Sequence, residues 1–404
     1  EAARRAEVAL ARNEAEPLQL ALRSAVAREG VTLEVTAPRS EAGATLPEPE
    51  VHRVGYVPID HPTSYYRSDT PEWHRKFPVT PGRCDGWAGW WPDPLLPAAP
   101  FDLAPAQTQP IWITLRAPAD ARPGEYSGSV RLKAAGETLR ELPYSVRVWP
   151  FALPDERHVI AMYDVRPGRQ FLEGGAPAEE VKRRMIQFLS ERRLCADRIP
   201  ADPVFGRDGD RVTADFAAFD AAAVWYFGDM RMPVAYFPGF FYVFGWAHPP
   251  KTILGEDPYE GGYPYEGADR SKLRPEYRRV YQAALRLFWD HIKAKGWADR
   301  MVLYISDEPH FTHEEVRRQM RAACEMIHEV DPKIRIYSST WRHCAEWDGH
   351  LDIWGIGHYG CFPMEEAGRL RREGHQIWFT TDGQMCTDTP YCAVERLLPH
   401  YCRS

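Results

Sequence analysis

Two adjacent carboxylates at the end of an apolar run carry the strongest chemical signal in the sequence. Residues 301–308 read MVLYISDE, and Asp307-Glu308 is followed by Pro309 and His310. Neighbouring side chains of a regular strand point to opposite faces, so both carboxylates can reach one ligand only where the strand's regularity breaks. Pro309 favours such a break because it helps end the strand and restricts the residue before it. The pair is therefore a candidate acid/base site.

Other chemistries find less support. A purely structural role for the pair is the alternative: Asp307 would cap the following helix, and Glu308 would be a solvated loop residue. His310, His313 and Glu314 offer metal ligands, but no HExxH motif is present, so we expect no metal and no cofactor. No GxSxG motif and no nucleophilic cysteine motif occurs, and the eight cysteines include no CxxC pair.

Alternating strands and helices must position these carboxylates. Short apolar runs after residue 157 are separated by amphipathic helical patterns, which predicts βα units around a parallel sheet. The seven runs cover 158–165, 195–199, 232–238, 301–308, 333–340, 351–357 and 376–382.

The number of units favours a TIM-type barrel. Seven units in the 247 residues from 158 to 404 approach the eight units and ~250 residues of a (β/α)8 barrel, and we expect strand 8 to lie beyond the end of the chain. A doubly wound open sheet is the competing architecture, but no GxGxxG or Walker A sequence follows the first strand. In a barrel the active site lies at the carboxyl ends of the strands, where Asp307 and Glu308 fall.

Strand-like alternation dominates the first part of the chain. Apolar and polar residues alternate in several runs between residues 18 and 148, and Ala135-Gly136 supplies a turn signal. We expect an antiparallel β-sandwich domain over 1–157, interrupted by a long proline- and aromatic-rich loop over 58–109. The catalytic barrel would then cover 158–404.

Composition and charge restrict the classes of binding partner that we expect. The 404 residues carry a formal net charge of −7 without long charged blocks, so nucleic acid is not an expected partner. No apolar stretch reaches the roughly 20 residues of a membrane helix, and no signal peptide is visible. The sequence leaves the cellular compartment open, and export to the periplasm or the cell exterior is compatible with a longer chain. The 36 prolines and 14 tryptophans suit a sugar-binding surface or an ordinary loop-rich β domain.

Four motifs together carry a family resemblance. ARNEAEPLQLAL at 11–22, WPDPLLP at 91–97, RPGEYSG at 122–128 and ISDEPH at 305–310 resemble glycoside hydrolase family 123 and its relatives in domain-of-unknown-function family 4091. The resemblance implies a β-sandwich followed by a (β/α)8 barrel and the activity of an exo-β-N-acetylgalactosaminidase. It also implies that Asp307 orients the substrate's 2-acetamido group and that Glu308 is the general acid/base.

Aromatic and polar residues near other strand ends are candidates for sugar contacts, since Tyr and Trp offer an apolar face and a polar edge. We expect four wall residues, Tyr337, Trp341, Tyr359 and Trp378, and two side chains that bond hydroxyls, His358 and Asp382. Trp378 could equally be core.

The expected function is hydrolysis of a terminal β-linked N-acetylhexosamine, with N-acetylgalactosamine as the favoured sugar. The substrate's acetamido oxygen would be the nucleophile and the configuration would be retained, so the usual carboxylate nucleophile is not needed. Two alternatives stay open. One is a glycosidase for non-acetylated sugars that pairs Glu308 with another strand-end carboxylate such as Asp382. The other is a noncatalytic carbohydrate-binding protein.

Overall fold

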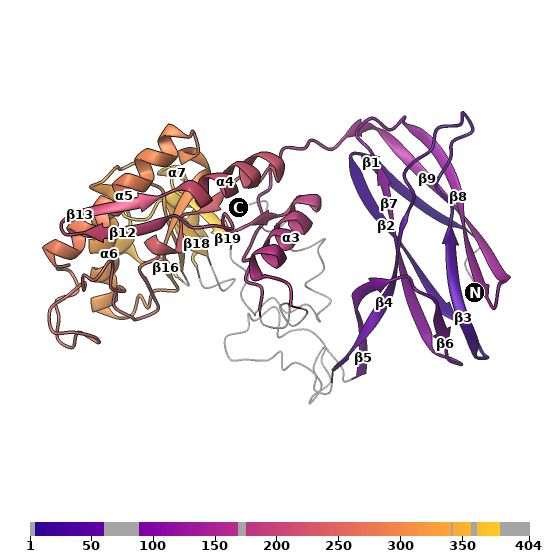
Figure 1. Ribbon diagram of the computed structural model, residues 1–404, viewed down its shortest axis with the longest axis horizontal. Coiled ribbons are helices and arrows are strands. Elements are labelled where there is room, and N and C mark those ends of the chain that lie inside the picture. The colour runs from indigo at the N-terminus through magenta and orange to yellow at the C-terminus, as the bar shows by residue number, and fades with distance from the viewer. Residues whose placement is uncertain (1–4, 60–88, 169–174, 341, 357–361, 380–404) are drawn as a thin grey trace. The chain divides into compact units, whose positions relative to one another are not determined.

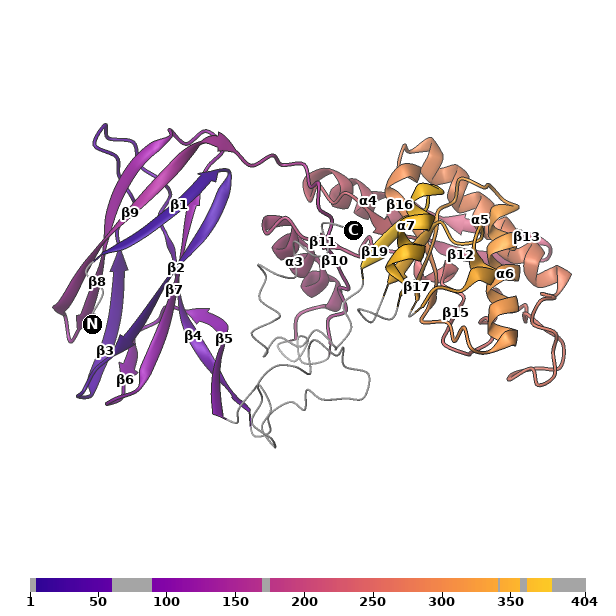
Figure 2. The same ribbon diagram turned by 180° about the vertical axis from the view of Figure 1, so that it is seen from behind.

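The structure is a computed structural model. It describes residues 5–59, 89–168, 175–340, 342–356 and 362–379. These residues form two compact units (Figures 1 and 2). The N-terminal unit comprises the described residues up to 156, and the C-terminal unit begins at Arg157.

The N-terminal unit consists of two β-sheets. One sheet has the strand order β1-β9-β8-β3-β6 and the other has the order β2-β7-β4-β5. The pairing of β1 with β9 is parallel, and the other pairings in these two sheets are antiparallel. The strands are β1 (Ala6–Arg12), β2 (Glu14–Arg23), β3 (Arg28–Val35), β4 (Glu50–Ile59), β5 (Gly89–Pro97), β6 (Phe101–Leu103), β7 (Thr108–Ala117), β8 (Gly124–Ala134) and β9 (Glu137–Ala152).

Both sheets contribute to one apolar core. Alternate residues of β7 are buried, among them Ile111 and Ile113, and they share the core with Val146 and Val148 of β9 in the other sheet. This is the period-two pattern that the sequence predicts. The expected turn at Ala135 lies between β8 and β9, where Ala135 has φ +51° and the following glycine has φ +83°.

The expected loop over 58–109 is only partly a loop. Residues 60–88 lie outside the described part of the chain, and β5 and β6 occupy much of the remainder. The prolines of WPDPLLP predicted a loop, yet this segment lies in β5 and pairs with β4. Because β5 is at the edge of its sheet, a proline there removes no hydrogen bond to a further strand.

The C-terminal unit is organised around parallel strands. All seven predicted runs contain a strand, namely β10 (Met162–Tyr163), β11 (Cys195–Ala196), β14 (Ala235–Tyr236), β16 (Met301–Asp307), β17 (Ile336–Thr340), β18 (Ile353–Ile356) and β19 (Gln376–Phe379). β10 pairs with β11 in a two-stranded sheet, and β14, β16, β17, β18 and β19 follow one another in a second sheet. Every one of these pairings is parallel. Between β11 and β14, Tyr236 N–H donates to Asp197 O at 2.7 Å.

Helices alternate with most of these strands (Figures 1 and 2). The α-helices that the structure describes are α3 (Ala178–Glu191), α4 (Ala217–Val224), α5 (Pro275–Ala294), α6 (Glu314–His328) and α7 (Met364–Arg372). In α5, Val280, Ala284, Phe288 and Ile292 recur every fourth residue and are all buried, as expected of a helix with one apolar face. No helix within the described ranges is long and apolar enough to cross a membrane.

Three features depart from simple alternation. A hairpin of β12 (Val204–Asp208) and β13 (Arg211–Asp215) precedes α4, and the short strand β15 (Phe244–Gly245) pairs with the end of β16. Between β17 and β18 the described chain has only a 3₁₀ turn at Ala345–Trp347. The fold is thus a mixed, β-rich one in which parallel strands bring their carboxyl ends to the same edge.

Candidate active site

The strand that carries Asp307 and Glu308 is irregular at its carboxyl end. Tyr304 of β16 is opposite Tyr337 of β17, but the next aligned residue is Ser306, so the register shifts between them. This bulge places the Asp307 carboxylate within reach of the Tyr304 phenol, which an unbroken strand would put on the opposite face. Glu308 then takes the left-handed conformation, with φ +43°. The break that the sequence analysis required is present.

Asp307 is held by two hydroxyl groups. Tyr304 Oη and Ser339 Oγ each donate to Asp307 Oδ1 at 2.7 Å, and they lie 3.1 Å from one another. Burial, the neighbouring Tyr337 and the charge of Asp307 raise the pKa of Tyr304 far above its ordinary range, so its phenol stays a donor at neutral pH. A carboxylate held by two donors in this way has a fixed orientation as a hydrogen-bond acceptor.

Glu308 has separate contacts. Its backbone N–H donates to Ser339 Oγ at 3.0 Å, and its Oε2 accepts from Trp246 Nε1 at 3.3 Å. Trp246 directly follows β15, and its own N–H donates to Asp307 O at 2.8 Å. Ser339 and Trp246 therefore each contact both members of the carboxylate pair.

Aromatic side chains pack beneath the carboxylates. Tyr304 lies with its ring centroid 5.0 Å from that of Tyr236 and 4.9 Å from that of Tyr337, and Trp378 lies 5.2 Å from Tyr337. Tyr337 is only 2% exposed. The structure therefore places this predicted wall residue in the core, where it supports Tyr304.

Another predicted wall residue, Trp378, lies beside Tyr337. Trp378 is half-buried against Tyr337, and its indole N–H donates to Gln376 Oε1 at 3.1 Å. Four predicted sugar contacts, Trp341, His358, Tyr359 and Asp382, lie outside the described residues.

Two histidines, His310 and His313, follow the carboxylate pair in the sequence. The rings of His310 and His313 lie 5.5 Å apart, and His313 Nδ1 is 3.5 Å from Glu315 Oε1. Across the described ranges, no group of three or more histidine, cysteine, aspartate or glutamate side chains is placed to hold a metal ion.

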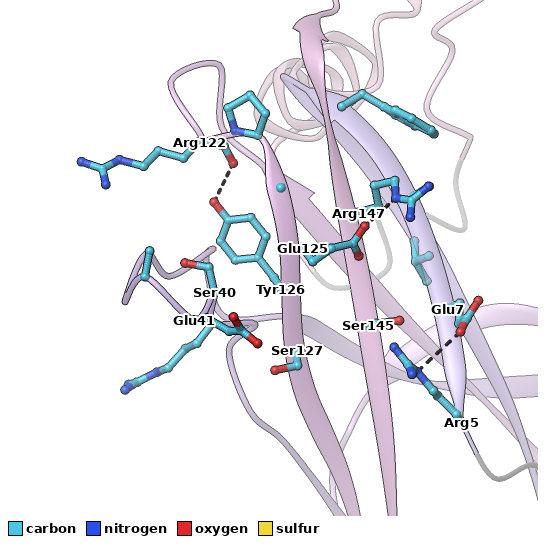
Figure 3. A pocket seen from close by; sticks show the side chains of 17 residues that line it. Arg5, Glu7, Ser40, Glu41, Arg122, Glu125, Tyr126, Ser127, Ser145 and Arg147 are labelled. Atoms are coloured by element: carbon cyan, nitrogen blue, oxygen red, sulfur yellow. Dashed lines mark hydrogen bonds and ion pairs between the residues drawn. The ribbon is translucent and has the colours of Figure 1, made fainter.

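A separate cavity lies on the N-terminal unit. It has a volume of about 920 Å³ and is lined by charged side chains, among which two ion pairs form (Figure 3). Arg147 Nε is 2.5 Å from Glu125 Oε1, and Arg5 Nε is 3.5 Å from Glu7 Oε1. None of the carboxylates at the end of β16 lines it.

Two models of known protein domains match the chain, one within each of the two units. The model of the glycoside hydrolase 123 N-terminal domain matches residues 12–134, and the model of the glycoside hydrolase 123 catalytic domain matches residues 240–358. The chain belongs to glycoside hydrolase family 123. The catalytic match spans Trp246, Asp307, Glu308 and Ser339, so the contacts described above fall inside it.

One solved structure of this family is similar in fold to the chain. A family 123 glycoside hydrolase from Clostridium perfringens, studied for its hydrolysis of glycolipid glycans, superposes with a TM-score of 0.59 at 12% identity, over 94% of this chain and 67% of that one. A family 5 xyloglucanase from Bacteroides ovatus shares 9% identity over 88% of this chain and 69% of its own, with a TM-score of only 0.25. The first likeness supports the fold, and the second is too low to indicate one. No curated protein matches the chain.

Three residues of this candidate site escaped the sequence analysis: Tyr304, Ser339 and Trp246. Ser339 had a detectable signal, because Ser338, Ser339 and Thr340 are polar residues that end an apolar run, and all three are buried. Trp246 had none, because its contact with Glu308 joins residues 62 positions apart.

Proposed function

We propose that this family 123 glycoside hydrolase removes terminal β-linked N-acetylgalactosamine from a glycan or glycoconjugate, with Asp307 and Glu308 as its catalytic residues. The observation that carries the proposal is the unequal environment of the two carboxylates. Asp307 accepts two hydroxyl donors, whereas the side chain of Glu308 accepts one, a tryptophan N–H. Different environments are what two carboxylates with different roles require.

In the proposed first step, Glu308 donates a proton to the glycosidic oxygen as the bond to the anomeric carbon breaks. The substrate's acetamido oxygen attacks that carbon and forms a cationic oxazolinium intermediate. Both donors to Asp307 reach Oδ1, and among the described residues no donor reaches Oδ2. Oδ2 is thus free to accept the acetamido N–H and to stabilise the positive charge.

In the second step, Glu308 takes a proton from water, which attacks the anomeric carbon and opens the intermediate. Attack from one face followed by attack from the other retains the configuration. No protein carboxylate becomes bonded to the sugar, so the ~5–5.5 Å separation of an ordinary retaining pair is not needed.

The architecture that we propose for this chemistry is a β-sandwich over residues 1–157 and a (β/α)8 barrel over 158–404. Two sheets with a common core support the sandwich. Two sheets of parallel strands, β10-β11 and β14-β16-β17-β18-β19, support the barrel, in which Asp307 and Glu308 would lie at the carboxyl end of the fourth strand.

Three nitrophenyl glycosides test the substrate. We expect turnover of 4-nitrophenyl N-acetyl-β-galactosaminide, slower turnover of the glucosaminide, and none of the galactoside that lacks the acetamido group. Equal turnover of the acetylated and non-acetylated galactosides would instead favour an ordinary carboxylate pair. Binding without turnover of any of the three would favour a noncatalytic carbohydrate-binding protein.

Two substitutions test the roles. Asp307→Asn should lower kcat on every acetamido substrate, whereas Glu308→Gln should lower it far more for poor leaving groups than for nitrophenolate, which needs little acid assistance. Glu325→Gln, on the exposed face of α6, is the matched control and should leave kcat unchanged. Isolation of a covalent sugar adduct on any carboxylate would contradict the mechanism.

A further inference from the structure

Two cationic side chains meet at one turn of the C-terminal unit. Lys251 Nζ donates to Gly239 O at 2.7 Å. The guanidinium of Arg198 lies close to the same glycine, because a Cβ added to Gly239 would be only 2.9 Å from Arg198 Nη1. Gly239 begins the 3₁₀ turn Gly239–Phe241 that follows β14, and Arg198 follows β11. Both cations therefore lie at the carboxyl ends of strands, as Asp307 does.

This arrangement carries an electrostatic cost. Lys251 is an exposed residue, but partial burial of its ammonium group and, next, the positive charge of Arg198 lower its pKa to about 8. Asp202 opposes this shift only in part. A pKa shifted both by burial and by a neighbouring charge is a common feature of ligand sites.

Arg198 is incompletely satisfied. Its Nε is buried without a hydrogen-bond partner, and the nearest carboxylate oxygen, Asp197 Oδ2, lies 3.4 Å away. The other oxygen of Asp197 accepts the N–H of Val165 at 3.1 Å. In the described part of the chain, the one acceptor near the guanidinium is Asp197 Oδ2, opposite Nε. Because the Arg198 side chain is 27% exposed, its terminal nitrogens can reach a ligand.

Tyr242 connects this pair of cations to the catalytic end of β16. Burial and the charge of Asp307 raise the pKa of Tyr242, while Arg166 and Arg198 act in the opposite direction. The Tyr242 phenol is close to β16 as well, because a Cβ added to Gly245 would lie 2.7 Å from its hydroxyl oxygen and 3.8 Å from Asp307 Cβ. Asp307 and Arg198 thus act on the same phenol. Arg166 is less available, since it is paired with Asp164 at 2.7 Å.

We propose that Arg198 and Lys251 form a subsite for an oxyanion substituent of the glycan, either a sulfate ester or a carboxylate. A guanidinium fork binds two oxygens of such a group at once, and an ammonium adds a point charge beside it. This inference rests on the proposed function for its location beside the acetamido group, and it adds a preference for acidic over neutral glycans. Internal pairing of Arg198 with Asp197 and of Lys251 with Asp202 is the competing explanation.

Matched substrates test the subsite. We compare kcat/KM for 4-nitrophenyl N-acetyl-β-galactosaminide with kcat/KM for its 4-sulfate and its 6-sulfate. For a carboxylate, we compare N-acetylgalactosamine linked to glucuronate with the same sugar linked to glucose. One anionic substrate should exceed its neutral partner by at least about tenfold, and which one does so identifies the anion.

The variants are judged by this ratio rather than by absolute activity. Arg198→Met and Lys251→Met should each bring the anionic-to-neutral ratio close to one, and Arg198→Lys should restore part of it. Lys272→Met removes an exposed lysine that pairs with Asp269 and should leave the ratio unchanged. A wild-type ratio of one, or a ratio that both methionine variants retain, would overturn the subsite in favour of internal pairing.

Direct binding separates this inference from the proposed function. If no N-acetylgalactosaminide is hydrolysed, the proposed function fails. Calorimetric titration of wild type with N-acetylgalactosamine, its two sulfates and inorganic sulfate still tests the cations. Tighter binding of a sulfated ligand by wild type than by Arg198→Met supports the subsite, and equal or absent binding of the sulfated ligands overturns it.

Discussion

Removal of one hydroxyl group tests whether the catalytic role of Asp307 depends on the hydrogen bonds that orient its carboxylate. Tyr304→Phe deletes the phenol that donates to Asp307 Oδ1 at 2.7 Å and leaves the second donor, Ser339, in place. The ring is retained, so its packing against Tyr236 and Tyr337 should persist. The substitution therefore changes one hydrogen bond in an otherwise preserved aromatic layer.

The size of the effect follows from the charge on the acceptor. A hydrogen bond to a charged group contributes roughly 1.5–3 kcal/mol. At about 1.36 kcal/mol for each tenfold change in rate, its loss predicts a decrease in kcat of about 10- to 150-fold. KM should change less, because the proposed role of Asp307 is to stabilise positive charge that develops after the substrate has bound.

The assay is steady-state hydrolysis of 4-nitrophenyl N-acetyl-β-galactosaminide, with thermal unfolding measured in parallel. Tyr259→Phe is the matched control, since Tyr259 is buried and its hydroxyl donates to Arg270 O at 3.0 Å, away from the carboxylates. It should lower the free energy of unfolding by about 1 kcal/mol and leave kcat unchanged.

A double-mutant cycle supplies the refutation. If Tyr304 acts through Asp307, then Tyr304→Phe should have almost no further effect on kcat in an Asp307→Asn background. Losses that multiply in the double variant would show that Tyr304 acts independently of Asp307. A single variant with full kcat would show that Ser339 alone holds the carboxylate.

Three further predictions concern the same unit. Trp246→Phe removes the indole N–H that reaches Glu308 at 3.3 Å and should slow poor leaving groups more than nitrophenolate, whereas equal slowing would argue against a role through the acid. Gly355→Ala places a Cβ 2.5 Å from the Tyr337 hydroxyl oxygen and should lower stability by about 1–3 kcal/mol in chemical denaturation; an unchanged midpoint would mean that the tyrosine moves freely. The pKa of Asp220 is lowered overall: burial acts to raise it, but hydrogen bonds from a lysine and a histidine near the end of α5 outweigh burial. The stability it contributes should be present above the unfolded-state pKa of about 3.9 and be lost as the pH falls through the lower folded-state pKa, so Asp220→Asn should flatten the acid limb of a thermal unfolding profile.

Strand positions in the C-terminal unit were predictable because buried parallel strands leave a direct mark on sequence. Their two faces are both covered, so they appear as short continuous apolar runs between helical patterns. The run at 301–308 became β16 almost residue for residue. The run at 158–165 became a strand only over Met162–Tyr163, because apolar character indicates burial but not how many residues pair with a neighbour.

The geometry at the end of β16 was not predictable in the same way. The sequence indicated that regularity must break near Asp307, but not that a bulge lies between Tyr304 and Ser306 or that Glu308 is left-handed. A bulge arises from the way in which two strands pair, and β17, the strand that pairs with β16 here, begins about thirty residues later in the sequence. The Trp246 contact depends on β15, a two-residue strand with no periodicity to detect.

The bulge explains why adjacent carboxylates can have different roles. In an unbroken strand, Asp307 and Glu308 would point to opposite faces, and Tyr304 could not reach Asp307. With the extra residue, the Ser339 hydroxyl both donates to the Asp307 carboxylate and accepts the Glu308 backbone N–H, so one side chain fixes the two residues relative to each other. Their side chains still have different donors, Tyr304 for one and Trp246 for the other. Adjacency in sequence therefore sets a short distance between the two groups, while the irregular backbone gives each its own electrostatic environment.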